Sequence, residues 1–310
     1  MEDIEDRCRV ALVQAAPVMF NKKKSAEKAV SLIRKAAEQK PDLIVFPELF
    51  VPGYPYGMTF GYTVGHRSEE GRKDWKMYAD NSIIVPGPET DALGAAAKEA
   101  NAYLSIGISE RDPISGTLYN SNLIFTPDGK IDALHRKLKP TGAERLVWGD
   151  ADRHYFPVTQ SPYGPIGNLI CGESYMPLAR TALYQKGVAI YISCNTNDNP
   201  EWQNTIRHIA LEGRCYFINA DMFFTRDMYP AASLHDPAPA EISALPDIVC
   251  RGGSCIVDPF GHYVTQPVWD KEEIIFADLD MQKVPAAKME FDPVGHYARN
   301  DVLELIVHDK

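Results

Sequence analysis

The stretch GNLICGESYMPLAR, residues 167–180, passes from an apolar run into the start of a helix, and Cys171 lies at the junction. The run GNLI indicates a buried strand, and Pro177 suits the first turn of the helix that follows. Cys171 therefore lies just upstream of the positive end of a helix dipole, which favours a thiolate. Glu173 and Ser174, with Pro177, are expected to shape the turn between the two elements.

Strand-like and helix-like segments alternate on both sides of this stretch. Residues 25–39 and 88–100 carry apolar side chains at helical spacing, which predicts two amphipathic helices. A strand-like apolar run precedes each of them in the sequence. Between residues 102 and 137, three strand-like runs are separated by Asp-Pro, Ser-Gly and Asp-Gly turn signals, which predicts an antiparallel meander. The pattern indicates mixed sheets covered by helices, a layered α/β sandwich.

The chain is expected to form one domain, because it has no internal repeat, no low-complexity segment and no Gly/Ser-rich linker. Residues 1–285 are predicted to be that domain. Residues 286–310 follow the final strand as a tail that packs on the domain or at a subunit interface. The Pro-rich segment 229–246 is predicted to be a surface loop.

Composition indicates a compact globular protein, since 45% of its 310 residues are apolar and 24% are charged. A formal net charge of −10 disfavours nucleic acid and anionic membranes as partners. The expected partners are a small molecule and other copies of the chain. No apolar run is long enough for a membrane helix and the N-terminal stretch is acidic, so we expect a cytoplasmic protein.

The six cysteines are widely scattered along the chain, with no C-x-x-C pair and no His-rich stretch beside them. This spacing suggests neither a disulfide framework nor a metal site, and no metal is expected. A buried structural thiol is the ordinary role of such a cysteine. Cys171 differs from the others because of its position between a strand and a helix.

Three apolar runs end on reactive groups. LIVFPE ends on Glu48, IDALHRK ends on Lys137, and GNLI is followed by Cys171. Ligands of open α/β sheets bind beyond the strand ends, so a carboxylate, an amine and a thiol would meet in one cleft if these ends are neighbours.

These three groups together would suit covalent hydrolysis. Glu48, packed among apolar strands, should have a raised pKa and act as a general base toward the thiol. Lys137 should stay charged and stabilise negative charge on the attacked group. A Cys with His and Asp remains an alternative, with His135 or His208 as the base, although no G-x-C-x-G elbow surrounds Cys171.

Three segments resemble, in chain order, the signature segments of the nitrilase superfamily of carbon–nitrogen hydrolases. They are VFPELFVPGYP (45–55), HRKLKPTGAERLVWG (135–149) and ICGESYMPLAR (170–180). The resemblance spans almost the whole chain. The chain resembles the true nitrilase branch in three short motifs, namely ER and VWG after the lysine and PLAR after the cysteine.

The resemblance implies a four-layer αββα sandwich that pairs into a dimer. It places Glu48 on the general base, Lys137 on the catalytic lysine, Cys171 on the nucleophile and Glu144 on an additional glutamate that positions substrate or supports the lysine. Strand alternation would put Lys139 on the same face as Lys137, but the family motif assigns Lys137.

The implied reaction converts a nitrile to a carboxylic acid and ammonia through a thioimidate and a thioester, with some amide if the thiol leaves first. It needs no cofactor. An amidase or N-carbamoyl amide hydrolase with the same three groups remains an alternative. A third alternative is a catalytically silent scaffold protein, against which the intact Glu48, Lys137 and Cys171 argue.

Two residues depart from the family pattern. Gly172 stands where true nitrilases usually carry Trp, and Gly142 stands where they usually carry His. Both changes remove volume, so a roomier pocket is expected. The residues expected to bind substrate follow the proposed catalytic groups in the sequence: Tyr54, Trp148, Gly172, Thr196 and Asn197. The sequence leaves open which nitrile they accept.

Overall fold

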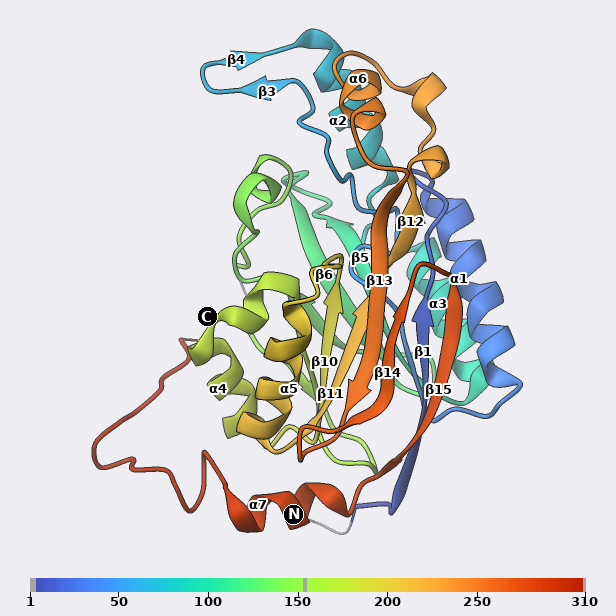
Figure 1. Cartoon of the computed structure of the whole chain (residues 1–310). Coiled ribbons are helices and arrows are strands. Elements are labelled where there is room, and N and C mark those ends of the chain that lie inside the picture. The colour runs from blue at the N-terminus through green and yellow to red at the C-terminus, as the bar shows by residue number, and fades with distance from the viewer. Residues whose placement is uncertain (1–3, 153–154, 309–310) are drawn as a thin grey trace.

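Two mixed β-sheets packed face to face form the centre of the molecule (Figure 1). The structure, a computed structural model, describes residues 4–152 and 155–308. In spatial order, the first sheet contains β15 (Glu273–Asp280), β1 (Arg7–Gln14), β2 (Leu43–Val45), β5 (Tyr103–Arg111), β6 (Leu118–Phe125) and β7 (Ile131–Arg136). The second contains β12 (Phe223–Thr225), β13 (Ile248–Val257), β11 (Tyr216–Asp221), β10 (Ile190–Asn195), β9 (Ile166–Ile170) and β8 (Val158–Thr159), with β14 (Tyr263–Trp269) paired to β13.

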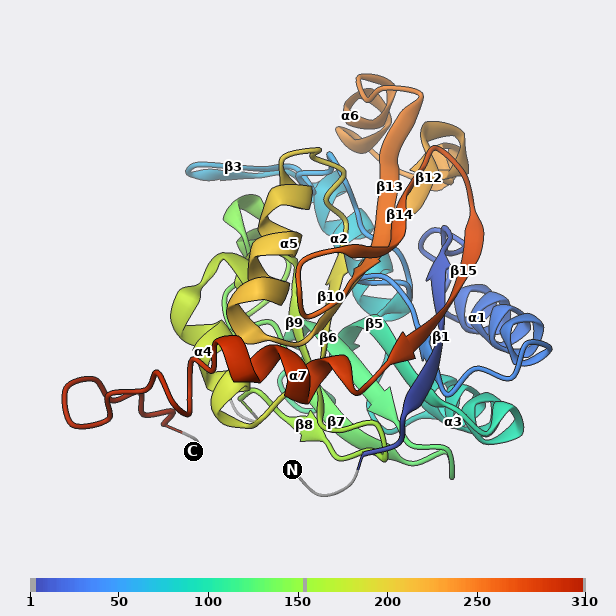
Figure 2. The ribbon, with the colours of Figure 1, turned by 60° about the horizontal axis from the view of Figure 1, so that its bottom comes forward.

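Helices cover the outer face of each sheet, as Figures 1 and 2 show. Helices α1 (Lys22–Ala37) and α3 (Pro88–Ala100) pack on the first sheet, and α4 (Pro177–Gln185) and α5 (Trp202–Gly213) pack on the second. The predicted four-layer αββα sandwich is therefore confirmed. The predicted meander is also confirmed, because β5, β6 and β7 pair antiparallel.

The apolar periodicity of the sequence explains this layering. Side chains such as Leu12 and Val45 of the first sheet meet Ile192 and Ile218 of the second in a core that excludes solvent. Helix α3 has the predicted bounds, because Pro88 occupies its first turn and Asn101 ends it with a left-handed φ of 51°. Truncating a core side chain of this kind to alanine costs about 2–5 kcal/mol.

Residues 229–246 lie largely at the surface, as predicted, but they are not a simple loop, and that part of the prediction is wrong. The segment contains the 3₁₀ turn Ala231–Ser233 and helix α6 (Ala238–Ser243). Four of its apolar side chains are buried, namely Tyr229, Leu234, Ala238 and Ile242. Prolines suggested a loop, but a proline is tolerated in the first turn of a helix, where α6 has one.

Helix α2 (Glu69–Asn81), which the sequence analysis did not predict, packs beside this segment. Buried Asp74 of α2 accepts hydrogen bonds from the backbone N–H of His235 at 2.9 Å and from its ring Nδ1 at 2.8 Å. We refer to α2 and residues 229–246 together as the cap. Figure 1 shows the cap at one end of the sandwich, beside the hairpin of β3 (Tyr62–Thr63) and β4 (His66–Arg67).

The C-terminal part begins with helix α7 (Lys283–Glu290), so the boundary expected after residue 285 falls inside a helix. Beyond it, Val294, Leu305 and Val307 lie against the core formed with α4 and α5. Residues 1–3 and 309–310, the ends of the expected domain and tail, lie outside the described residues. Within the described ranges, no helix has the length and apolar character needed to cross a membrane.

Candidate active site

The loops that follow three strands bring Glu48, Lys137 and Cys171 together. Lys137 and Cys171 are the first residues after β7 and β9, as the sequence predicted. Strand β2 ends earlier than predicted, at Val45, and Glu48 lies three residues further on. Glu48 is completely buried there, and Gly107 of β5 allows this loop to pass closely, since a Cβ on Gly107 would lie 2.7 Å from the Glu48 Cα.

Lys137 lies between two carboxylates. Its Nζ donates to Glu48 Oε1 at 2.9 Å and to Glu144 Oε2 at 2.8 Å. All three side chains are buried, and Asn120 of β6 donates a further hydrogen bond to Glu48 Oε1 at 2.7 Å. Glu48 Oε2 has no hydrogen-bond partner among the described residues. One carboxylate oxygen is therefore free to accept a proton.

Burial and neighbouring charges set the protonation of this cluster. Burial raises the pKa of Glu48, although Lys137 opposes the shift, and Glu144 raises it further. Burial works to lower the pKa of Lys137, but the charges of Glu48, Cys171 and Glu144 outweigh burial and hold it well above its usual range. Glu48 thus has the raised pKa expected of a general base, and Lys137 stays charged.

Cys171 is the partly exposed cysteine of the chain, whereas the other five, all in the described part, are buried. Its backbone has a φ of 49°, in the left-handed region that a residue with a Cβ rarely adopts. Such strain costs of order 1–3 kcal/mol and persists where the surroundings enforce it. The surrounding structure therefore holds the backbone of Cys171 in a conformation that is unfavourable for this residue in isolation.

Glu173 enforces that turn. Its carboxylate accepts from the backbone N–H of Ile170 at 2.7 Å, from that of Leu138 at 2.5 Å and from His135 Nε2 at 2.9 Å. Burial works to raise the pKa of Glu173, but His135 and these hydrogen bonds outweigh burial and lower it. Glu173 thus shapes the turn, as predicted, and also fixes the Cys171 turn to the residue that follows Lys137.

Burial raises the pKa of the Cys171 thiol, and the nearby carboxylates of Glu48, Glu144 and Asp221 reinforce the effect against Lys137. This differs from the expectation of a thiolate stabilised by the helix N-terminus, because α4 begins only at Pro177, after the 3₁₀ turn Cys171–Tyr175. A thiol with a raised pKa needs a base before it can attack.

The expected substrate-binding residues lie around this cluster in different ways. Tyr54 donates its hydroxyl to Glu144 Oε1 at 2.8 Å, and its ring lies 5.9 Å from that of Trp148. Trp148 is buried and donates its ring N–H to Ser109 Oγ at 3.1 Å. Trp148 thus packs beside Tyr54, and its part in binding substrate stays a prediction.

Thr196 and Asn197 follow β10 and lie near Asp221, one of the carboxylates that act on Cys171. The Thr196 hydroxyl is buried and has no hydrogen-bond partner among the described residues. The backbone N–H of Asn197 donates to Asp221 Oδ1 at 2.8 Å. Thr196 therefore retains hydrogen-bonding capacity, whereas Asn197 is held through its backbone.

The two glycines that depart from the family pattern differ in the space beside them. A Cβ on Gly172 would lie 2.7 Å from Thr141 Oγ1, so Thr141 occupies room that a larger residue would need. A Cβ on Gly142 would meet no atom within 4 Å, although its φ of 54° favours glycine. The space expected from small residues is thus open at Gly142 and filled at Gly172.

The alternative bases named from the sequence are engaged elsewhere. His135 is buried and binds Glu173, and His208 is exposed on α5 and pairs with Glu212 at 3.0 Å. Lys139 is exposed and pairs with Asp150 at 2.5 Å. Lys137 is therefore the lysine of the cluster.

Sequence reasoning missed Asn120 and Asp221. Both are polar residues in fully buried strands that carry other polar side chains, and a buried polar side chain signals a hydrogen-bond network. Burial raises the pKa of Asp221 well above its usual range, and Asn219 donates to its Oδ2 at 2.9 Å. Asp221 thus supports the loop that carries Thr196.

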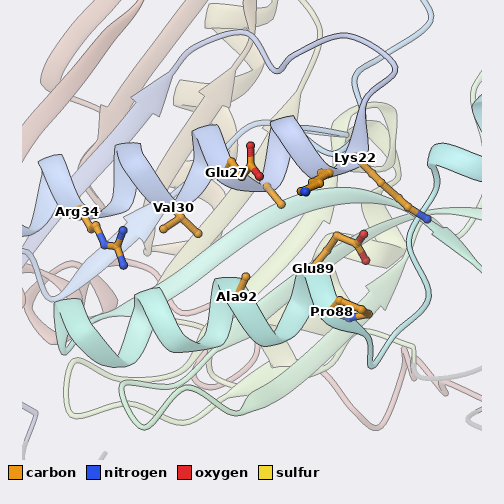
Figure 3. A pocket seen from close by; sticks show the side chains of 9 residues that line it. Lys22, Glu27, Val30, Arg34, Pro88, Glu89 and Ala92 are labelled. Atoms are coloured by element: carbon orange, nitrogen blue, oxygen red, sulfur yellow. The ribbon is translucent and has the colours of Figure 1, made fainter.

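A groove lies away from this cluster, on the outer side of the first sheet between α1 and α3 (Figure 3). Its volume is about 640 Å³, and the residues along it that Figure 3 labels are Lys22, Glu27, Val30, Arg34, Pro88, Glu89 and Ala92. This lining has no nucleophile. In residues 4–152 and 155–308, no group of three or more His, Cys, Asp or Glu side chains could hold a metal ion.

An αββα sandwich with a cysteine beside a buried lysine and two carboxylates carries the groups that thiol-based hydrolysis needs. The family model described as carbon-nitrogen hydrolase matches residues 9–289. The chain is 46% identical to the aliphatic nitrilase of Sinorhizobium fredii over 303 residues, which are 97% of this chain and 96% of that protein. The chain therefore belongs to the carbon-nitrogen hydrolase family, within the nitrilase superfamily, and the resemblance noted in the sequence is confirmed.

Two further comparisons agree. The chain is 41% identical to the bifunctional nitrilase/nitrile hydratase NIT4A of Lupinus angustifolius over 302 residues, 97% of this chain and 86% of that protein. The crystal structure of Saccharomyces cerevisiae Nit3, a member of branch 10 of the nitrilase superfamily, superposes with a TM-score of 0.74 at 22% identity, covering 96% of this chain and 99% of that one. The latter likeness concerns the fold alone.

Proposed function

We propose that this protein hydrolyses a nitrile to the carboxylic acid and ammonia, with Cys171 as the nucleophile. The observation that carries the proposal is the likeness to an aliphatic nitrilase at 46% identity along 97% of the chain. The arrangement of Glu48, Lys137 and Glu144 beside the thiol supports it, because it supplies a base and a fixed cation where the reaction needs them.

In the first half of the reaction, Glu48 takes the proton of the Cys171 thiol as sulfur attacks the nitrile carbon. A carbon–sulfur bond forms, one π bond of the C≡N group breaks, and the nitrogen receives a proton from Glu48 or Lys137. The product is a thioimidate. Lys137, held between two carboxylates, stabilises the negative charge that develops on nitrogen, at no cost of reorganisation.

In the second half, a water activated by a carboxylate adds to the thioimidate carbon and ammonia leaves, which gives a thioester. A second water releases the acid and returns the proton to sulfur. The balance is one nitrile and two waters to one acid and one ammonia. If sulfur leaves before ammonia, one water is consumed and an amide is released, the activity that the second part of the lupin protein's name denotes.

The residues around the cluster are proposed to bind the substrate. Tyr54 and Trp148 supply an aromatic wall, with Tyr54 also holding Glu144. Gly172 is proposed to contact the substrate through its backbone beside the thiol, with Thr141 occupying the space next to it. Thr196 and Asn197 are proposed to supply polar contacts, because the Thr196 hydroxyl, which has no partner among the described residues, can offer a hydrogen bond to the substrate.

We further propose that residues 1–285 act as the hydrolase unit and that the tail 286–310 packs on it or at a subunit interface. Apolar side chains on α4 and in the tail support this, since Leu178 and Leu303 are exposed. The proposed assembly is a homodimer or a larger homo-oligomer in the cytoplasm, without nucleic acid or membrane as a partner.

Ammonia release from a panel of nitriles and the matching amides tests the proposal, with acid and amide products resolved by chromatography. Acid and ammonia from nitriles are expected. Activity on amides alone would place the protein with the amidases or N-carbamoyl amide hydrolases instead. Activity on neither, with a thiol at Cys171 that resists alkylation, would favour a silent scaffold protein.

The pH dependence of kcat/KM is expected to show an acid limb set by Glu48. Because burial raises the pKa of Glu48, the limb should lie above the usual carboxyl range, and activity should rise with pH as Glu48 ionises. Glu144→Gln removes a charge that raises this pKa, so the limb should move to lower pH, at a reduced overall rate. Asp150→Asn, an exposed carboxyl in the same region, should leave the limb in place. A limb that stays or rises in Glu144→Gln would contradict the assignment.

A further inference from the structure

A cavity of about 200 Å³ opens beside Glu144. One wall is the loop 54–59 and the other is the segment 143–148 that carries Glu144. The lining residues are Tyr54, Pro55, Gly57, Met58, Thr59, Ala143, Glu144, Val147 and Trp148. The hydrogen bond from Tyr54 to Glu144 joins the two walls at the cluster. The position of loop 54–59 therefore sets the width of this cavity.

Loop 54–59 contains no helix or strand, and the cap holds it from outside. Both carboxylate oxygens of Glu241 in α6 bind Thr59, one accepting from its backbone N–H at 3.1 Å and the other from its hydroxyl. Tyr229 donates its hydroxyl to the carbonyl of Tyr56 at 2.9 Å. A Cβ on Gly57 would lie only 2.8 Å from Leu245 Cδ2, so Leu245 closes on the loop directly.

The cap is itself anchored, so it can act as a fixed support. The Arg226 guanidinium donates to the carbonyls of Ser243 at 3.2 Å and Leu245 at 2.7 Å, which fixes the end of α6. His235 is bound to buried Asp74 of α2. A loop without helix or strand that is held at several points by an anchored element keeps one shape, and so the cavity keeps one size.

The size and lining of the cavity indicate what it would accept. A cavity of about 150 Å³ can hold a benzene ring, so 200 Å³ suits an acyl group of about that size or smaller. The lining is mainly apolar, and its one ionisable carboxylate, Glu144, would repel an anion. The cavity thus fits an uncharged organic group with few polar atoms.

We propose that Glu241 is a specificity-determining residue that holds loop 54–59 against a pocket for the uncharged side group of a small nitrile. This inference rests on the proposed nitrile hydrolysis and adds the class of substrate. Glu241 does not touch the reacting atoms. It acts through Thr59 and the loop, and it limits the size of the group that reaches Cys171.

The test uses Glu241→Ala and, as a second route to the same lost contact, Thr59→Val. Both should raise the ratio of kcat/KM for naphthonitrile over propionitrile by about tenfold, mainly through KM. Glu241→Ala, whose side chain lies outside the cavity lining, should leave kcat/KM for propionitrile within about threefold. The double variant should change the ratio no more than either single one, because both remove the same contact. Ser243→Ala, whose exposed hydroxyl lies on the same helix, should match the wild type. A naphthonitrile-to-propionitrile ratio unchanged in both single variants would overturn the proposal.

Alkylation separates this proposal from the proposed function. The rate at which Cys171 reacts with N-phenylmaleimide, relative to iodoacetamide, can be followed by mass spectrometry without any turnover. The proposal predicts a higher ratio of the two rates in Glu241→Ala and Thr59→Val. If the wild type hydrolyses no nitrile but this ratio still rises, the reaction is wrong and the control of pocket size stands. If nitriles are hydrolysed and the ratio does not change, the control of pocket size is wrong and the reaction stands.

Discussion

Replacing Cys171 with alanine is expected to lower kcat for nitrile hydrolysis by 10⁴-fold or more, an order of magnitude typical for the loss of a covalent nucleophile. The reason is that neither Glu48 nor Lys137 can form the thioimidate without a sulfur atom at this position. Ammonia release under saturating nitrile measures the effect. Far-ultraviolet circular dichroism should be unchanged, because the thiol donates no hydrogen bond that shapes the turn, which Glu173 holds instead.

A matched control is Cys215→Ala. Cys215 is buried in the core formed with α4 and α5. Its replacement is expected to lower the stability of the fold and to leave kcat within about twofold of the wild type. Cys171→Ser provides a stricter comparison, because it keeps the shape but offers a hydroxyl that Glu48 cannot readily deprotonate. Hydrolysis at more than about one tenth of the wild-type rate in Cys171→Ala would exclude the thiol as nucleophile.

The sequence predicted the parts of the fold that rest on local periodicity. Helix α3 has the predicted bounds because Pro88 and the residues around Asn101 mark its ends within the sequence itself. The cap could not be predicted in this way. Helix α2 is largely charged, and the hydrogen-bond partner of its buried Asp74 is His235, 161 residues away along the chain. A contact between residues so far apart in the chain leaves no periodic signal in the sequence of α2 or of residues 229–246.

The candidate site shows the same division. Glu48, Lys137 and Cys171 were found because each follows an apolar run, a local feature. Glu173 was recognised only as part of a turn. Its hydrogen bond to the backbone of Leu138 depends on how two separate loops meet, which no spacing in the sequence records. Asn120 was missed because an amide within a strand has several equally good explanations until the strand's neighbours are known.

Replacing Lys137 with methionine is expected to remove activity and to lower the free energy of unfolding by about 3–5 kcal/mol at neutral pH. Methionine fills much of the same volume, but Glu48 and Glu144 would lose the cation to which both are hydrogen-bonded in a buried site. Urea unfolding followed by tryptophan fluorescence measures the change. Lys139→Met is the matched control two residues away, and its exposed pair with Asp150 should contribute less than about 1 kcal/mol.

The pH dependence identifies the cause of the lost stability. Without Lys137, nothing opposes the effect of burial on Glu48, so the pKa of its carboxyl in the folded state should rise further above the unfolded value. A raised carboxyl pKa carries no penalty below the unfolded pKa and an increasing one as pH rises toward the folded pKa. The deficit of Lys137→Met should therefore shrink toward pH 4. Adding Glu48→Gln should recover part of the stability at neutral pH but none of the activity, because the base is then missing as well. A deficit that is equal at all pH values would mean that Lys137 stabilises the fold by packing, and the cluster would lose its electrostatic role.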